Sequence, residues 1–166
     1  AVNNGIQSST AYINYSVLLF QSGEDEKALD VAEDSVELFP DHPEPYVNLM
    51  SMFYVVGKTK KAIRVGKNAI ARFPHDIAQY HCQGDIYARE EMWGECLKCF
   101  QTALDNGLED YLVYLHLSLA SSQLGKDQDA ITYFNKAKQF STDTHDAEML
   151  KLEKHLASKH HQQLGQ

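Results

Sequence analysis

An interval of 34 residues is the feature that most constrains this chain. Tyrosines recur at that interval, and so do two sets of small residues. The tyrosines are Tyr12, Tyr46, Tyr80 and Tyr114. The small residues are Ala28, Ala62, Cys96 and Ala130, followed seven positions later by Ser35, Ala69, Ala103 and Ala137. Four copies that never leave this register predict stacked structural units that share one elongated core.

Within each unit the apolar residues are spaced by three and four positions, which predicts helices and leaves no room for strands. The helices are expected at 9–22, 25–38, 43–56, 59–72, 77–90, 93–106, 111–124, 127–140 and 144–161. Gly23, Gly57 and Gly125 mark the turn inside three units, where the fourth has Glu91. Helix-capping residues precede the first helix of most units. They are Ser8, Asp76, Asp110 and Thr144.

This pattern resembles the tetratricopeptide repeat family, whose unit is a 34-residue helix–turn–helix opened by a large residue. Ser16, Met50 and Ser118 depart from the family's usual glycine, which only Gly84 keeps. The resemblance implies an all-α fold, a right-handed superhelix (an α–α solenoid) with a C-terminal capping helix. The expected organisation is the end of a preceding repeat at 1–8, repeats at 9–42, 43–76, 77–110 and 111–143, a capping helix at 144–161 and a frayed tail at 162–166.

Composition and charge narrow the classes of function that the chain can have. A formal net charge of −8 argues against a nucleic-acid footprint, which needs a basic face. No apolar run reaches membrane-spanning length, so no membrane insertion is expected. Three cysteines are an odd number in a chain that needs no disulfide to fold, and they favour a reducing compartment such as the cytoplasm.

The first helix of the units is apolar on more than one face. One stripe is accounted for by the second helix of the same unit, and a further stripe in the first unit contains Ile13, Val17 and Phe20. A helix that is hydrophobic on several faces must be buried by something. In arrays of the family this stripe lines the concave face, so the resemblance implies a largely apolar groove. The alternative is that neighbouring helices of the same chain bury the stripe.

Polar residues interrupt the stripe in the third unit. In one interpretation, Arg89 and His81 set the register of a bound segment. In the other, Asp85 and Arg89 form an exposed intrahelical ion pair. A column of Asn14, Asn48, Cys82 and His116 resembles the start of an asparagine ladder that holds an extended peptide. The full predicted groove is Asn14, Val17, Phe20, Val47, Asn48, Tyr54, His81, Asp85, Arg89, Leu115, His116 and Leu119. Phe20, Tyr54, Leu115 and Leu119 are its predicted apolar anchors.

Other chemistries find less support. The family's clamp for acidic chaperone C-terminal tails needs cations on successive first helices, which this chain lacks, so such tails are not expected as partners. The second helix of the first unit is acidic and that of the second unit basic, which favours either correct stacking or a convex patch for an acidic partner. Cys96 and Cys99 form a C-x-x-C, but Cys99 is expected towards the outer face, so no metal site is predicted.

No catalytic triad, paired catalytic carboxylates or phosphate-binding loop is visible, so we expect neither an enzyme nor a cofactor. The sequence predicts a scaffold that captures a peptide or helix of a partner protein, apolar with a few polar register contacts. Two alternatives remain at this point. The array would position substrates for a larger enzyme, or its apolar face would mediate self-association into a homo-oligomer.

Overall fold

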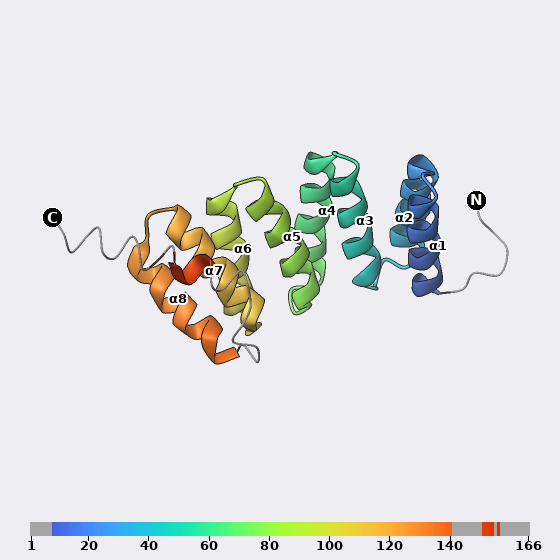
Figure 1. Ribbon diagram of the computed structural model, residues 1–166. Coiled ribbons are helices and arrows are strands. Elements are labelled where there is room, and N and C mark those ends of the chain that lie inside the picture. The colour runs from blue at the N-terminus through green and yellow to red at the C-terminus, as the bar shows by residue number, and fades with distance from the viewer. Residues whose placement is uncertain (1–7, 141–150, 155, 157–166) are drawn as a thin grey trace. The chain divides into compact units, whose positions relative to one another are not determined.

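The chain is all-α in the residues that a computed structural model describes, which are 8–140, 151–154 and 156. Its helices follow one another in pairs (Figure 1). They are α1 (Ser9–Gln21), α2 (Asp25–Leu38), α3 (Glu44–Val55), α4 (Thr59–Arg72), α5 (Ile77–Arg89), α6 (Trp93–Asp105), α7 (Tyr111–Gln123) and α8 (Asp127–Phe140). These bounds confirm the helix ranges predicted between residues 9 and 140, to within one residue at each end.

The helices belong to two compact units that divide within α5, between Ile86 and Tyr87. In the first unit α1 packs against α2, α3 against α4, and α3 also contacts both α1 and α2. In the second unit α7 packs against both α6 and α8. First helices therefore lie beside first helices within the first unit, which is the arrangement that forms a common face.

Each hairpin turn closes with a left-handed residue. After α1, Gly23 has a φ of 81°, its N–H donates to the Phe20 carbonyl at 3.0 Å, and the next N–H, that of Glu24, reaches the Leu19 carbonyl at 2.9 Å. This is the Schellman pattern, which satisfies the last carbonyls of a helix. The same two bonds recur after α5, where Glu91 takes a φ of 55° in place of glycine. Glu91 therefore replaces glycine in the sequence but adopts the same left-handed backbone conformation.

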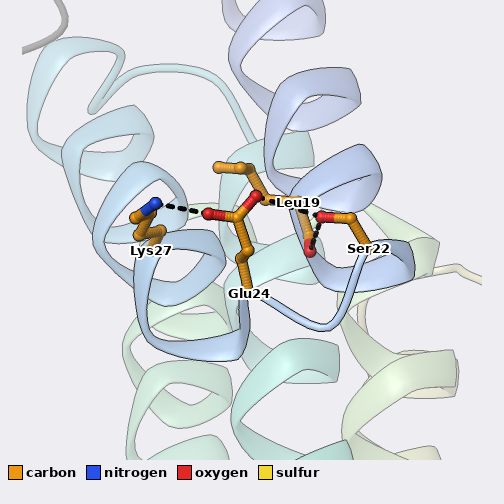
Figure 2. A network of polar contacts seen from close by, with 4 residues as sticks. All are labelled: Leu19, Ser22, Glu24 and Lys27. Atoms are coloured by element: carbon orange, nitrogen blue, oxygen red, sulfur yellow. Dashed lines mark hydrogen bonds and ion pairs between the residues drawn. The ribbon is translucent and has the colours of Figure 1, made fainter.

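Polar contacts tie the α1–α2 turn together (Figure 2). The Ser22 hydroxyl donates to the Leu19 carbonyl at 2.8 Å and lies 3.3 Å from Oε1 of Glu24. The Lys27 ammonium donates to the other oxygen of Glu24, and this hydrogen bond lowers the pKa of that carboxyl. The three polar side chains lie near the surface, so the network fixes the turn without burying charge.

The periodic residues build the core. All eight small residues of the two predicted columns are fully buried. The Tyr46 ring packs edge to face on Phe73, with centroids 5.4 Å apart, and its hydroxyl donates to the Pro40 carbonyl at 3.1 Å. The Tyr80 hydroxyl makes the equivalent bond to Pro74 at 3.0 Å. At Tyr46, the tyrosine that opens a first helix therefore packs on the end of its own unit's second helix and bonds to the end of the preceding one.

The C-terminal part is described only in places. Residues 151–154 are helical, and Leu152 and Leu156 are buried in a cluster with Leu115 and Phe134. The rest of the predicted capping helix at 144–161, the predicted repeat end at residues 1–7 and the predicted tail at 162–166 lie outside the described residues. The division of the chain into repeats at the predicted boundaries stays a prediction.

Candidate functional site

An open pocket of about 380 Å³ lies on the face of the first unit where α1, α3 and the start of α5 come together. Apolar side chains make most of its surface. Its lining residues are Ile13, Glu44, Val47, Asn48, Ser51, Asp76, Ala78 and Gln79. We name this hollow the α1–α3–α5 pocket. Among the predicted groove residues it brings together Val47 and Asn48. Ile13 belongs to the stripe predicted in the first unit, and Ser51 lies 34 residues after Val17 of that stripe.

Hydrogen bonds between helices hold the walls of the pocket in place. Nδ2 of Asn48 donates to the Ser16 hydroxyl at 2.9 Å, which links α3 to α1. Oγ of Ser51 lies 3.4 Å from Sγ of Cys82, which links α3 to α5. Because these bonds come from three different helices, the pocket is a preformed feature of their packing. The predicted asparagine column therefore joins helices at Asn48 and Cys82.

The floor of the pocket is set by Gln79, which is fully buried. Its Nε2 donates to the Pro43 carbonyl at 2.8 Å, joining the start of α5 to the start of α3. Its Oε1 is buried and has no hydrogen-bond partner among the described residues. A buried acceptor in this state is uncommon in native proteins.

Carboxylates stand at the rim. Glu44 is the first residue of α3 and is exposed, and Asp76 precedes α5. Oδ1 of Asp76 accepts the backbone N–H of Ala78 at 3.1 Å, so one of its oxygens caps the helix. The sequences of α1, α3 and residues 77–86 contain no Lys or Arg. The charged residues that line the pocket are therefore both acidic.

The other predicted residues of the first two repeats lie outside this pocket. Asn14 and Val17 are exposed on α1. Phe20 and Tyr54, predicted as anchors, are partly buried against the hydrophobic core of the first unit. Their rings thus contribute to packing of the chain itself, and only their remaining surface is open to a partner.

On α5, His81 and Asp85 are half-buried and Arg89 is exposed. Each of the three takes part in an interaction of its own. His81 and Asp85 belong to the first unit and Arg89 to the second. Their predicted role in setting the register of a bound segment stays a prediction.

In the second unit the predicted groove is covered. Leu115 is only 5% exposed and packs against Phe134, Leu152 and Leu156, and Leu119 packs on the same cluster. The prediction of Leu115 as an open anchor is therefore wrong, because side chains near the C-terminus occupy its face. The His116 ring stacks on Phe100 of α6 with centroids 4.8 Å apart.

Sequence reasoning missed four of the residues that shape the pocket, namely Glu44, Asp76, Ala78 and Gln79. A signal was present for Gln79. It occupies a column that reads Ala11, Pro45, Gln79 and Val113, so one polar residue stands in an otherwise apolar series. A polar residue at a core position marks either a structural hydrogen bond or a site, and Gln79 supplies the first at Pro43.

The cysteines are buried to different degrees. Cys99 is 8% exposed, so its predicted outward position is wrong, because α6 also buries that side in its packing. Burial raises the pKa of the Cys99 thiol to about 12 and also raises that of Cys82. Within the residues that the structure describes, no three His, Cys, Asp or Glu side chains are grouped as a metal site requires. None of the described helices is long and apolar enough to cross a membrane.

Comparison with known proteins identifies the architecture. The model of the tetratricopeptide repeat family matches residues 111–143. No curated protein has a sequence that matches this chain. Solved structures match over most of its length, at low sequence identity.

One of these structures is TTC0263, a thermophilic TPR protein of Thermus thermophilus, with a TM-score of 0.66, 18% identity and coverage of 87% of this chain and 81% of that one. PilF of Pseudomonas aeruginosa has a TM-score of 0.71 and 22% identity, over 87% of this chain and 67% of that one. MamA from residue 41 of Desulfovibrio magneticus RS-1 has a TM-score of 0.66 and 15% identity, over 95% of this chain and 96% of that one.

At these identities the structural matches speak for the fold alone, and that fold is the superhelical solenoid of helical hairpins that the sequence predicted. The family model thus identifies residues 111–143 as a tetratricopeptide repeat, and the chain shares the fold of solved structures that include a TPR protein.

Proposed function

We propose that this chain is a non-catalytic scaffold for protein–protein interaction, and that the α1–α3–α5 pocket receives a segment of a partner protein. The observation that carries the proposal is the pocket itself, an open and mainly apolar hollow of about 380 Å³ on three first helices. Concave, mostly apolar sites with a few polar groups are the usual places where proteins bind ligands.

The composition of the pocket suits a peptide. Ile13, Val47 and Ala78 offer apolar contact, and Asn48 and Ser51 add polar groups between them. Peptide recognition commonly combines apolar anchors with a few orienting hydrogen bonds. Because hydrogen bonds to Ser16 and Cys82 already fix the walls, the side chains of the pocket lose little conformational entropy when a segment binds.

The test uses peptides selected for binding from a random library displayed on phage. Val47→Arg places a long charged side chain in the pocket, and we expect it to weaken binding of the selected peptides at least about tenfold. Val55→Arg is the matched control, because Val55 lies on the same helix, is 64% exposed and does not line the pocket. Affinity is measured by fluorescence polarisation, and far-UV circular dichroism checks that both variants keep their helices.

Peptides that bind Val47→Arg as tightly as the wild type would assign binding to another face. Light scattering on the same samples addresses self-association. A wild-type dimer that becomes a monomer in Val47→Arg, with no peptide selected, would give the pocket to a second copy of the chain instead.

A further inference from the structure

We infer that the α1–α3–α5 pocket is selective for a lysine or arginine side chain of the bound segment. This inference rests on the proposed function and names the chemistry of its partner. Three features of the pocket carry it, which are its apolar walls, its carboxylate rim and an unpaired acceptor in its floor.

The walls suit the stem of a basic side chain. Lysine and arginine carry three or more methylene groups that pack on apolar surface while the charged head stays near water. Ile13, Val47 and Ala78 supply apolar surface from three different helices. A wholly apolar side chain would satisfy these walls as well, so the walls alone do not choose the ligand.

The carboxylates at the rim favour a basic side chain over an apolar one. Glu44 and Asp76 line the pocket, and Asp76 uses one oxygen to cap α5, which leaves the other available to a ligand. Among the elements that line the pocket, α1 is uncharged, α3 holds only Glu44, and residues 77–86 add Asp85 beside the half-buried His81. The lysines and arginines of the first unit lie on α2, on α4 and at Lys58. Within α1, α3 and residues 77–86, no lysine or arginine competes for the carboxylates. A cationic group gains attraction here, whereas an acidic segment is repelled.

The floor adds an acceptor. Nε2 of Gln79 is held by the Pro43 carbonyl, so the amide cannot turn round without losing that bond, and Oε1 remains without a donor among the described residues. An ammonium group has three donors and a guanidinium five. A basic head group therefore brings more donors than the two rim carboxylates need, while a carboxylate ligand would bring none.

The test compares peptides that differ in one side chain. Each is an acetylated and amidated pentapeptide of alanine with lysine, norleucine or glutamate at its centre, where norleucine keeps the stem of lysine without the ammonium. Binding to the full ¹⁵N-labelled chain is followed by NMR from the amide signals of Val47, Asn48 and Ala78. We expect saturable shifts with the lysine peptide at an affinity about fivefold or more above that of norleucine, and none with glutamate.

Two double variants test the origin of the preference. Glu44→Gln with Asp76→Asn removes both rim charges, and asparagine keeps an oxygen that caps α5. Asp30→Asn with Glu33→Gln removes the same net charge from exposed positions of α2. The first pair should abolish the advantage of lysine over norleucine, and the second should keep it.

The outcomes separate the inference from the proposed function. Equal affinities for lysine and norleucine, with shifts at the pocket, would overturn the inference and leave the proposed function standing. A lysine preference that survives the loss of Glu44 and Asp76 charge would also overturn it. Phage-selected peptides that perturb other residues and leave the pocket signals unmoved would overturn both.

Discussion

One position of the repeat has two different environments in this molecule. Val47 on α3 lines an open pocket, whereas Leu115, two repeat lengths later on α7, is 5% exposed and sits in a closed apolar cluster. The next position of the stripe behaves in the same way, since Ser51 lines the pocket and Leu119 packs on the cluster. The helices are alike, and the difference lies in what covers them.

The cover of the second unit comes from Leu152 and Leu156, which lie far along the chain from α7. No equivalent side chains cover α3 among the described residues, so its stripe stays open. A repeat motif therefore fixes which residues form a stripe, while the side chains packed over that stripe decide whether it is core or open surface.

The largest expected effect on stability comes from truncating the two equivalent residues, Leu115 and Val47. Leu115→Ala should cost about 2–5 kcal/mol of unfolding free energy, because it leaves a cavity among Phe134, Leu152 and Leu156. Val47→Ala at the equivalent position should cost less than about 1 kcal/mol, because Val47 is only partly buried. Urea denaturation followed by circular dichroism measures both. Equal losses would mean that the two stripes are covered alike.

A smaller effect contrasts two helical glycines. A Cβ on Gly66 of α4 would lie 1.6 Å from Oε1 of Gln83 and 2.7 Å from Sδ of Met50, and both of these side chains are buried. Gly66→Ala should therefore cost about 1–3 kcal/mol, partly offset by the better helix propensity of alanine. Gly94 on α6 has no atom within 4 Å of such a Cβ. Gly94→Ala should stabilise the chain by about 0.5–1 kcal/mol.

A double variant sharpens this prediction. Adding Gln83→Ala to Gly66→Ala removes the clashing oxygen, so the pair should cost less than the sum of the single losses. Thermal unfolding of the four proteins gives the coupling. Strictly additive losses of stability would show that the Gln83 side chain moves aside without cost, and that its position does not require a glycine at residue 66.

The smallest effect contrasts two tyrosine hydroxyls. Tyr46 donates to the Pro40 carbonyl at 3.1 Å and Tyr114 to Oε2 of Glu109 at 2.5 Å. At neutral pH each Tyr→Phe change should cost about 0.5–1.5 kcal/mol. Burial and then Glu109 raise the pKa of Tyr114 from 10.0 to about 12.

The raised value gives Tyr114 a distinct alkaline signature. Its contribution to stability is complete below a pH of about 10 and is lost as the pH rises towards 12, because the unfolded chain then loses the proton first. Tyr114→Phe should therefore show a shallower loss of stability over that range than the wild type. Parallel alkaline curves for the two proteins would contradict the assigned environment of Tyr114.

The local features of the fold followed from sequence. The helix ranges, the turn at each Gly and the buried columns of tyrosine and small residues depend on contacts within a hairpin or between neighbouring hairpins. Such contacts recur at the repeat interval, so the 34-residue period reports them directly. Glu91 takes the same turn conformation as the glycines of the other repeats, because the Schellman hydrogen bonds after α5 hold its backbone in the left-handed region.

The tertiary structure decided the rest. Cys99 and Leu115 were predicted outside and lie inside, and Gln79 joined two helix starts to form the floor of a pocket that periodicity did not reveal. These outcomes depend on side chains from other elements, which no pattern within one repeat records. Sequence alone determined which residues share a face, and only the packing of distant segments determined which faces remain open.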